Sequence, residues 1–462
     1  MERTSFFTKD KIFYKTLFSM LIWVAFQNLV AYSVNMVDNV MLGNYNQDAL
    51  AGAATVNQIF FMVQQFALAI GNSLVAISAQ YWGQKKTEPI VKLTGIAMRL
   101  GIITSIIIVA VCAIAPEAVL HIFTNDPAII AQGVTYLAII KWTFLLFIVT
   151  QILMCALRSV GTVKISFYIS VISLIINVAI NYVLIFGKFG FPELGVKGAA
   201  IGTLIARCVE LVIVLFYIIK KETKIRLFTK EILQIDKLLR RDYTKVYIPI
   251  MCSQVLWGVS VPMQTAILGH VSDIAIAANS VATTFYQYLK VIVIAMSATS
   301  AVMIGNAIGR GDMTRIKSDA RTLAVIDVVI GLILGVALIL FRNPLLSCYG
   351  ALTPEVEVLA RHMIVIMGFV MIGMSYQMPV SFGIIQGAGD AKFTMKMNLI
   401  STWCIVMPLS FMAAFWWKLP IEVVVIVIQS DQIFKGLPTF IRFRGYKWVK
   451  KLTRTDAELA EQ

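Results

Sequence analysis

The amino-acid sequence predicts an all-α polytopic membrane protein with twelve transmembrane helices in two six-helix lobes, related by a pseudo-twofold axis along the membrane normal. Three observations predict this fold class: a composition too apolar for a water-soluble protein, apolar runs of the length needed to cross a bilayer, and a pattern of glycines and charges that occurs twice along the chain. Together they give both the number of helices and their division into halves.

The composition indicates a protein that lies in lipid. Of the 462 residues, 59% are hydrophobic and 14% are charged, and the mean hydropathy is +0.81. Soluble domains are about 45–50% apolar and about 25% charged, so this chain differs from them on both counts. The sequence shows no segments of about ten residues with the alternating polarity of a membrane β-barrel strand, which leaves helices as the spanning elements.

Apolar runs divide the chain into spans. A hydrocarbon core ~30 Å thick needs about 20 apolar residues per helix. Measured against this length, the sequence predicts twelve helices. In chain order they cover residues 16–40, 52–80, 91–115, 128–156, 163–187, 196–220, 244–269, 276–307, 320–341, 354–384, 391–416 and 419–440. The first residues, MERTSFFTKDK, contain no small-residue cleavage site, so we expect no signal peptide.

Basic residues are distributed unevenly between the connections. The chain has 40 Lys and Arg against 25 Asp and Glu, a net charge of +15. Most of the basic residues lie at the termini and in one alternate set of connections. The other set holds Lys188, Lys197, Arg342 and Lys418. This positive-inside pattern predicts that both termini are cytoplasmic and that the protein is a multi-pass protein of the plasma membrane. It also accounts for the charge without nucleic acid as a partner.

These patterns divide the chain into four segments. The connector is expected to be solvated and to face the lipid surface, with phosphate binding as the alternative. The segments are an N-terminal lobe at 1–220, a cytoplasmic basic connector at 221–243, a C-terminal lobe at 244–440 and a cytoplasmic basic tail at 441–462.

The two lobes share a repeated pattern. With an offset of 226 residues, Leu42-Gly43 falls on Leu268-Gly269, and Gly83 falls on Gly309. With an offset of 228, Gly161 and Lys164 meet Gly389 and Lys392. Glycines and charges that recur in order across several helices indicate a duplication. Because each half has an even number of helices, both run through the membrane in the same sense, as in many secondary transporters with a central cavity between halves.

Several segments carry a resemblance to a known family. They are VDNVMLGNYNQDALAGAA, GNSLVAISAQYWGQKK, LRSVGTVKISFYISVISLIINVAINYVLIFGKFGFPELGVKGAAIGT, ILGHVSDIAIAANSVATTFYQ and GNAIGRGD. In these segments, and over nearly its whole length, the chain resembles the multidrug and toxic compound extrusion (MATE) family. The stretch from Arg158 to Thr203 is the most specific. The resemblance implies a cation-coupled antiporter that exports organic, often cationic, compounds by alternating access between two lobes.

Polar residues form stripes on two helices of the first half. On the first helix, the spacing of 4, 3 and 4 residues places four side chains on one face. They are Asn28, Tyr32, Asn35 and Asn39, with Gln27 and Asp38 beside them. On the fifth helix a second stripe comprises Ser170, Ser173, Asn177 and Asn181. Since lipid does not solvate such faces, both stripes are expected to point inward.

The family resemblance implies ion coupling at four of these positions: Asp38, Asn177, Asn181 and Thr203. The coupling ion is H⁺ or Na⁺, and no other cofactor is expected. Some family members carry a second carboxylate on the fifth helix, where this chain has Asn181. This difference argues against a two-acid proton relay and leaves coupling through a single acid. The alternative is a polar lock that only holds the first helix against the fifth.

A substrate cavity is predicted from residues of both halves. Aromatic rings can stack on cationic drugs, and flexible methionines suit a cavity that accepts many shapes. Ordinary packing is the alternative for the methionines, and a snorkelling or paired lysine is the alternative for Lys290. The predicted lining residues are Tyr32, Asn35, Trp257, Gln287, Lys290, Met367, Met371 and Met374.

Other embedded charges have local explanations, with one exception. Arg207 and Glu210 are three residues apart, and Asp431 and Lys435 are four apart, so each is expected to form a pair within one helix. Asp327 has no evident partner in the sequence. The cores of the seventh and tenth helices contain no acid, which argues against the sodium site that some family members have there.

Rival functions have less support. The three histidines and six cysteines show no metal-ligand spacing, and no GxxxxGK[ST] loop is present, so neither an enzyme nor an ATP-driven pump is expected. A channel does not need a duplicated set of asymmetric polar sites. The remaining alternative is a lipid-linked oligosaccharide flippase with the same two-lobe plan. The predicted partners are small organic substrates and the bilayer, and the protein is expected to be monomeric.

Overall fold

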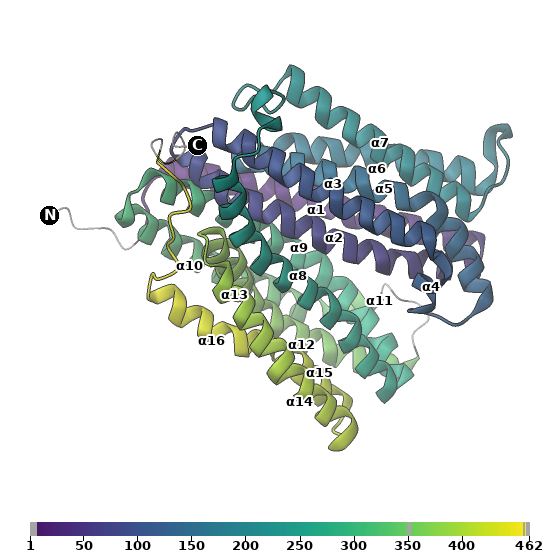
Figure 1. Ribbon diagram of the computed structural model, residues 1–462. Coiled ribbons are helices and arrows are strands. Elements are labelled where there is room, and N and C mark those ends of the chain that lie inside the picture. The colour runs from purple at the N-terminus through teal and green to yellow at the C-terminus, as the bar shows by residue number, and fades with distance from the viewer. Residues whose placement is uncertain (1–6, 348, 350–352, 456–457, 459–462) are drawn as a thin grey trace. The chain divides into compact units, whose positions relative to one another are not determined.

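The regular structure of the protein is helical. The computed structural model describes residues 7–347, 349, 353–455 and 458 (Figure 1). Within these residues, twelve helices are long and apolar enough to cross a membrane. The predicted fold class and number of spans are thus confirmed, and most helices extend a few residues beyond their predicted ends.

The first half of the chain contains six spans and one short helix. Capping side chains begin two of the spans: Asn46 accepts a hydrogen bond from the Asp48 amide, and Asp126 accepts from the amides of Ala128 and Ile129. The helices are α1 (Lys11–Tyr45), α2 (Gln47–Gly83), α3 (Glu88–Ile114), the short α4 (Pro116–His121), α5 (Pro127–Ser159), α6 (Lys164–Phe186) and α7 (Val196–Lys220), with short 3₁₀ turns η1 (Lys188–Gly190) and η2 (Lys230–Leu233).

The second half also contains six spans, three of which are divided. Its undivided helices are α8 (Lys237–Val271), α9 (Asp273–Arg310), α10 (Met313–Leu340) and the short α11 (Arg342–Ser347). The tenth span is α12 (Pro354–Met378) continued by the π-helix η3 (Pro379–Ile385). The eleventh comprises α13 (Ala391–Asn398), η4 (Leu399–Val406), α14 (Met407–Phe411) and η5 (Met412–Trp416), and the twelfth comprises α15 (Ile421–Gln429) and α16 (Asp431–Arg444).

The duplication read from the sequence is present in the helix bounds and in the packing. Both ends of α8 lie 226 residues after the ends of α1, and α9 begins 226 residues after α2. In the first half, α2 and α3 pack on α5, and in the second half, α9 and α10 pack on α12. Each half therefore repeats the same local arrangement of helices.

Two compact units divide the chain at places that differ from the predicted lobe boundaries. The N-terminal unit comprises residues 26–247, and the C-terminal unit comprises residues 7–25 and 248–454. The start of α1 belongs to the C-terminal unit because polar contacts tie the preceding segment to α10. The Thr8 hydroxyl donates to Asp319 at 2.5 Å, and Arg315 pairs with Asp10 at 2.5 Å. Hydropathy alone could not show this attachment.

The basic connector is packed rather than fully solvated, which corrects the expectation from its composition. Ile225, Leu227 and Leu239 are buried. The Arg99 guanidinium on α3 donates to the carbonyl of Leu233 at 2.5 Å, and η2 contacts α3. The connector is thus anchored to the N-terminal unit through backbone and apolar contacts.

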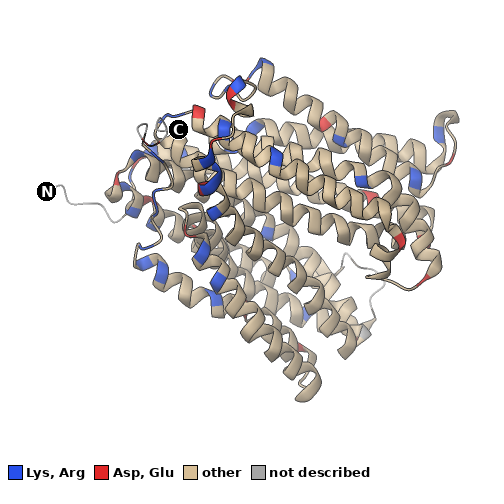
Figure 2. Ribbon diagram, in the orientation of Figure 1, with Lys and Arg blue, Asp and Glu red and all other residues tan. Residues whose placement is uncertain are grey.

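The basic tail is likewise attached within its own unit. Arg442 and Lys450 each approach the buried carboxylate of Asp390 at 2.5 Å, and Trp448 is fully buried. Residues 456–457 and 459–462 of the predicted tail lie outside the described residues. Across both units, most Lys and Arg residues lie in connections and at helix ends (Figure 2). This distribution is the one expected of membrane-spanning helices.

Candidate functional site

A chain of hydrogen bonds joins three helices of the N-terminal unit. The Asn181 Nδ2 group on α6 donates to the Asp38 carboxylate on α1 at 2.7 Å and lies 3.3 Å from the Asn177 oxygen. The Asn177 Nδ2 group in turn donates to the Thr203 hydroxyl on α7 at 3.2 Å. The structure therefore brings together the four residues Asp38, Asn177, Asn181 and Thr203, which lie far apart in the sequence.

The two asparagines are buried because α6 turns its polar stripe toward α7. Asn177 is 1% exposed and Asn181 is fully buried. Gly202 on α7 makes this packing possible, since a Cβ atom at that position would lie only 1.9 Å from the Asn181 Oδ1 atom. Sequence reasoning did not single out Gly202. The sequence feature that indicates close packing at this position is the run of small residues GAAIGT at residues 198–203.

Two further residues border this network. Tyr136 on α5 is buried and hydrogen-bonds through its hydroxyl to Thr203. Arg207, one turn beyond Thr203 on α7, pairs with Glu210 at 2.7 Å, as predicted, and its guanidinium lies 5.1 Å from the ring centre of Phe147. Arg207 therefore has its own carboxylate partner, although its charge also acts on Asp38, whereas the hydrogen-bond donor to Asp38 is a neutral amide.

The remaining polar residues of α1 do not join this network. Tyr32 is 37% exposed, and Asn35 and Asn39 are exposed. Gln27 donates to the Met154 sulfur at 3.6 Å. Thus, of the polar face predicted on α1, Asp38 is the residue that contacts the stripe of α6, while Tyr32 and Asn35 lie at a surface of the unit.

A lysine and a tryptophan meet in the C-terminal unit. The Lys290 ammonium on α9 lies 5.1 Å from the ring centre of Trp257 on α8. Both side chains are partly buried, whereas Gln287 is exposed. The charged group that acts on Lys290 is a second cation, Lys435. A cation over an aromatic ring is stabilised by the ring quadrupole, so Lys290 has a neutral partner at a partly buried position.

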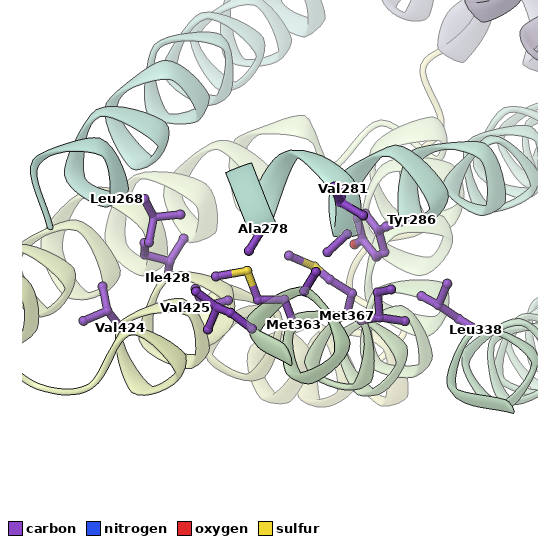
Figure 3. Close-up of a cluster of buried hydrophobic side chains, with 14 of the residues drawn as sticks. Leu268, Ala278, Val281, Tyr286, Leu338, Met363, Met367, Val424, Val425 and Ile428 are labelled. Atoms are coloured by element: carbon purple, nitrogen blue, oxygen red, sulfur yellow. The ribbon is translucent and has the colours of Figure 1, made fainter. Parts of the chain in front are cut away.

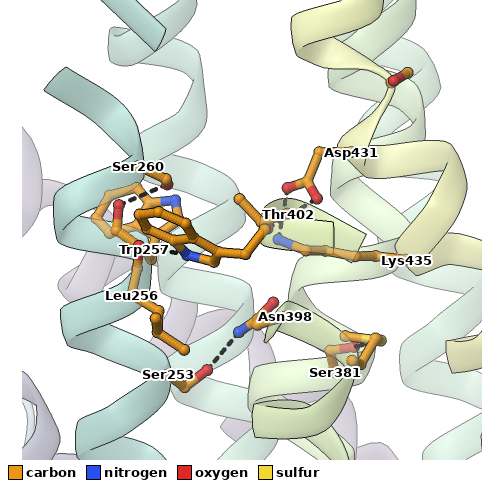
Figure 4. Close-up of polar contacts among 12 residues, drawn as sticks. Ser253, Leu256, Trp257, Ser260, Ser381, Asn398, Thr402, Asp431 and Lys435 are labelled. Carbon is orange, nitrogen blue, oxygen red and sulfur yellow. Dashed lines mark hydrogen bonds and ion pairs between the residues drawn. The ribbon is translucent and has the colours of Figure 1, made fainter. Parts of the chain in front are cut away.

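The second predicted ion pair is present in the same unit (Figure 4). Lys435 approaches Asp431 at 2.5 Å, and the Thr402 hydroxyl donates to the other carboxylate oxygen at 3.1 Å. A neighbouring polar contact joins Asn398 of α13 to Ser253 of α8. Asp431 is therefore neutralised by a fixed cation on its own helix.

The methionines of α12 lie in the apolar core of the C-terminal unit (Figure 3). Met367 and Met371 are fully buried and Met374 is nearly so, and the Tyr286 hydroxyl lies 2.7 Å from the Met374 sulfur. These methionines therefore pack in a core, which is the alternative to their lining a substrate cavity. Other members of the cluster include Val281, Leu338, Met363, Val424, Val425 and Ile428.

Metal ligands are not gathered anywhere in the described part of the chain. No three His, Cys, Asp or Glu side chains come together there. The five cysteines within the described residues are free thiols, and Cys348 lies outside those residues. The polar network around Asp38 is accordingly a site of one carboxylate surrounded by amides and hydroxyls.

Comparison with known proteins finds matches across both halves. The family model MatE matches residues 24–183 and 249–412. "Uncharacterized transporter YisQ" of Bacillus subtilis is 24% identical over 443 residues, which cover 96% of each chain. "Probable multidrug resistance protein NorM" of Thermotoga maritima is 23% identical over 437 residues, which cover 94% of this chain and 93% of that one.

Solved structures share the fold. The MATE transporter VcmN of Vibrio cholerae, in its bent form, has a TM-score of 0.81 and 21% identity, with 94% of this chain and 96% of that chain covered. A MOP superfamily transporter from Pyrococcus furiosus, titled for the reverse polarity of its binding pocket, has a TM-score of 0.85 and 15% identity, with 96% and 97% covered.

Proposed function

The chain belongs to the MatE family, and from this premise we propose that it is a secondary active transporter that exports organic compounds from the cell in exchange for H⁺ or Na⁺. The names of the curated relatives, which include multidrug resistance proteins, support efflux of several compounds. Twelve membrane-length helices support a multi-pass protein of the plasma membrane. The positive-inside pattern supports cytoplasmic termini. The protein is proposed to act as a monomer on cationic or amphipathic substrates.

The observation that carries ion coupling is the neutral hydrogen bond between Asn181 and Asp38. A buried carboxylate with a fixed cation stays ionised, whereas an amide can serve either form of the acid. The Asn181 Nδ2 group donates to the carboxylate. Its Oδ1 atom is buried, has no hydrogen-bond partner within the described residues and faces Gly202, so rotation of the amide about its last side-chain bond would offer an acceptor to the protonated acid. Binding and release of one cation is therefore possible without leaving a buried charge unpaired.

The flippase alternative is less well supported by the embedded charges. A pyrophosphate-bearing lipid needs a strongly cationic cavity. Here Arg207 pairs with Glu210, Lys435 with Asp431, and Arg361 with Glu357. Lys290 lies over Trp257 and could meet one acidic group of a substrate. Lys141 on α5 lies over Trp142 in a similar way. Two lysines of this kind do not make a strongly cationic cavity and are compatible with amphipathic or zwitterionic export substrates, so no enzymatic step and no flippase function is proposed.

The test is export from everted vesicles and proteoliposomes with a panel of cationic dyes, under separate H⁺ and Na⁺ gradients. We expect gradient-driven export in the wild-type protein and no export driven by ATP once the gradients are collapsed. Asp38→Asn keeps the shape of the side chain but cannot bind a cation as a carboxylate does. We expect this variant to bind dye and to lose gradient-driven export.

The matched control is Asp48→Asn, the same chemical change at an exposed acid in the first turn of α2. It should export at the wild-type rate. Near wild-type export by Asp38→Asn would contradict coupling at this acid and favour the polar lock. Export that persists without any ion gradient would contradict the proposed function itself.

A further inference from the structure

A buried carboxylate that is not part of the Asp38 network lies in the C-terminal unit. Asp327 stands near the middle of α10 and is 1% exposed. Neither of its carboxylate oxygens has a hydrogen-bond partner within the described residues. The opposite side of α10 is exposed and apolar, as expected of a surface that meets lipid. Its exposed residues include Val325, Val328, Val329, Leu332 and Ile333. Asp327 therefore points into the unit.

The side of α10 that carries Asp327 packs against α12. Gly331, one turn further along α10, lies so close to α12 that a Cβ atom there would be 2.8 Å from the Ser375 hydroxyl oxygen. The next residue, Tyr376, is near enough for an ionised Asp327 to act electrostatically on its hydroxyl. The hydroxyls of Ser375 and Tyr376 are both buried, and both lack a hydrogen-bond partner in the described part of the chain. Three buried polar side chains that hydrogen-bond neither to one another nor to other described residues thus lie on two packed helices.

The backbone of α12 changes at the same level. In an α-helix, each backbone amide donates to the carbonyl four residues earlier. Pro379 lies four residues after Ser375 but has no amide hydrogen, so the carbonyl of Ser375 does not receive this bond. From Pro379 the helix continues as the π-helix η3. Short π-helical segments within α-helices occur frequently at functional sites. Pro379 thus accounts for the irregular turn, which begins three residues after Tyr376.

A buried acid in such surroundings must be either neutral or accompanied by a cation. An ionised carboxylate without a partner is costly to bury, and ionisable residues within membrane spans are functional by default. Hydroxyl groups can donate to a carboxylate and accept from a carboxylic acid, so Ser375 and Tyr376 can serve both forms. One carboxylate beside two hydroxyl groups can therefore bind and release a proton.

We propose that Asp327 is a second proton-binding site, in the C-terminal unit, which takes up and releases one proton in each transport cycle, and that the hydroxyls of Ser375 and Tyr376, which make no hydrogen bond in this structure, bond to it during the cycle. The proposal rests on the function proposed above. The uptake converts the carboxylate to a carboxylic acid and the release reverses it, so that no other reactant is needed.

Neighbouring charged residues do not fix the protonation state of Asp327 within the described part of the chain. Tyr376 on α12 is the titratable group whose hydroxyl senses the Asp327 charge, and Arg444 of α16 acts on Tyr376. The helix η3 contains no titratable residue. Among the described residues, no charged side chain of α9, α11 or α12 acts electrostatically on Asp327. The site is also not a copy of the Asp38 site, because the 226-residue offset places Asp327 on Gly101 of α3.

Infrared difference spectroscopy tests proton binding directly. Purified protein in lipid nanodiscs is stepped between acidic and alkaline pH, and the C=O stretching band of protonated carboxylic acids is recorded. We expect one such band to be lost in Asp327→Asn and a different one to be lost in Asp38→Asn. Ser375→Ala and Tyr376→Phe should shift the Asp327 band without removing it, and these two variants keep the test decisive if Asp327→Asn does not fold.

A band of Asp327 that does not respond to pH would overturn the proposal and identify a permanently neutral, structural acid. Loss of the band on addition of Na⁺ at constant pH would overturn it in favour of a sodium site. The proposal would also be overturned if no band were lost in Asp327→Asn and no band were shifted in Ser375→Ala or Tyr376→Phe.

The transport assay then separates this proposal from the proposed function. In proteoliposomes, Asp327→Asn should still export dye but should lower the number of protons exchanged per substrate by one, measured from the gradient at which net transport stops. An unchanged ratio with normal wild-type export would refute the role of Asp327 and leave the proposed function intact. Lack of gradient-driven export by the wild-type protein would instead refute the function.

Discussion

The two halves of the chain place a basic residue at the same position of the repeat but use it differently. With the 228-residue offset, Arg207 falls on Lys435 and Thr203 falls on Asp431. In the N-terminal unit, Arg207 pairs with Glu210, and Asp38 is held by a neutral amide. In the C-terminal unit, the basic residue pairs with the acid one turn before it. The same helix arrangement therefore presents one acid with a neutral partner and one with a fixed cation.

The difference shows how duplicated halves can acquire separate tasks. An ion pair with both partners buried is stable only while both charges remain, because the loss of one leaves the other uncompensated. Asp431 and Lys435 are accordingly suited to holding helices together. An acid bonded to an amide has no such constraint. Asp38 can change its charge, which is what the proposed coupling role requires.

Breaking the ion pair should give the largest effect on stability. Lys435→Met leaves the buried Asp431 without its cation, and we expect this to lower the free energy of unfolding by about 3–5 kcal/mol. The double variant Lys435→Met with Asp431→Leu should recover most of the loss, since no charge remains buried. Thermal unfolding in detergent measures both. If Asp38→Asn destabilised the protein as much as Lys435→Met, the proposed contrast between the two acids would be wrong.

Crowding the network of the N-terminal unit should have a smaller effect on stability and a clear effect on export. In Gly202→Ala the new Cβ atom collides with the Asn181 amide, and such overpacking costs about 1–3 kcal/mol. Displacement of the amide from Asp38 should also reduce gradient-driven export. The control is Gly436→Ala on α16, where no atom lies within 4 Å of the added Cβ, and where alanine should slightly stabilise the helix.

Equal export by Gly202→Ala and Gly436→Ala would show that the position of the Asn181 amide does not matter for coupling. It would thereby remove the distinction drawn between the two halves.

Removing single hydroxyls should give an effect of about 1 kcal/mol on stability in either half. Thr203→Val takes away the acceptor of Asn177, and Thr402→Val takes away a donor to Asp431. We expect only Thr203→Val to slow export, because Asn177 and Asn181 share the network of Asp38. Parallel export assays and unfolding curves compare the two variants. Similar slowing of export by Thr402→Val would extend the coupling role to the C-terminal unit.

The smallest effect is expected at the exposed start of α1. The backbone amide of Ile12 holds the pKa of Asp10 below its usual value, and the Arg315 side chain acts in the same direction. Because this pKa is lowered on folding, the contact stabilises the protein above the unfolded pKa of about 3.9 and loses its effect as the pH falls through the folded value. Asp10→Asn should therefore reduce stability slightly near neutral pH and not at strongly acidic pH.

Export by Asp10→Asn should remain at the wild-type level, since this acid is partly exposed, precedes α1 and belongs to the C-terminal unit. A loss of export as large as that expected for Asp38→Asn would show that attachment of the N-terminal segment, rather than cation binding within α1, controls transport. Vesicle assays of the two variants side by side distinguish these outcomes.

The sequence by itself determined the features that depend on local spacing. The twelve spans follow from runs of apolar residues, and the repeat follows from glycines and charges at a constant offset. The pairs Arg207–Glu210 and Asp431–Lys435 could be predicted because residues three or four apart are neighbours on any helix. The polar stripe of α6 is likewise a consequence of helical periodicity, and its buried position follows from the cost of exposing it to lipid.

Only the tertiary structure decided which helix faces meet. Asp38 and Asn181 are 143 residues apart, and nothing in the local pattern says which asparagine donates to the acid or that Gly202 gives it room. The burial of Met367 in a core, the attachment of Thr8 to α10, and the close packing of Gly331 against Ser375 are contacts of the same kind. Periodicity states which side of a helix is polar or small, but its partner is selected by the packing of complete helices, in which every side chain at the interface must fit at once.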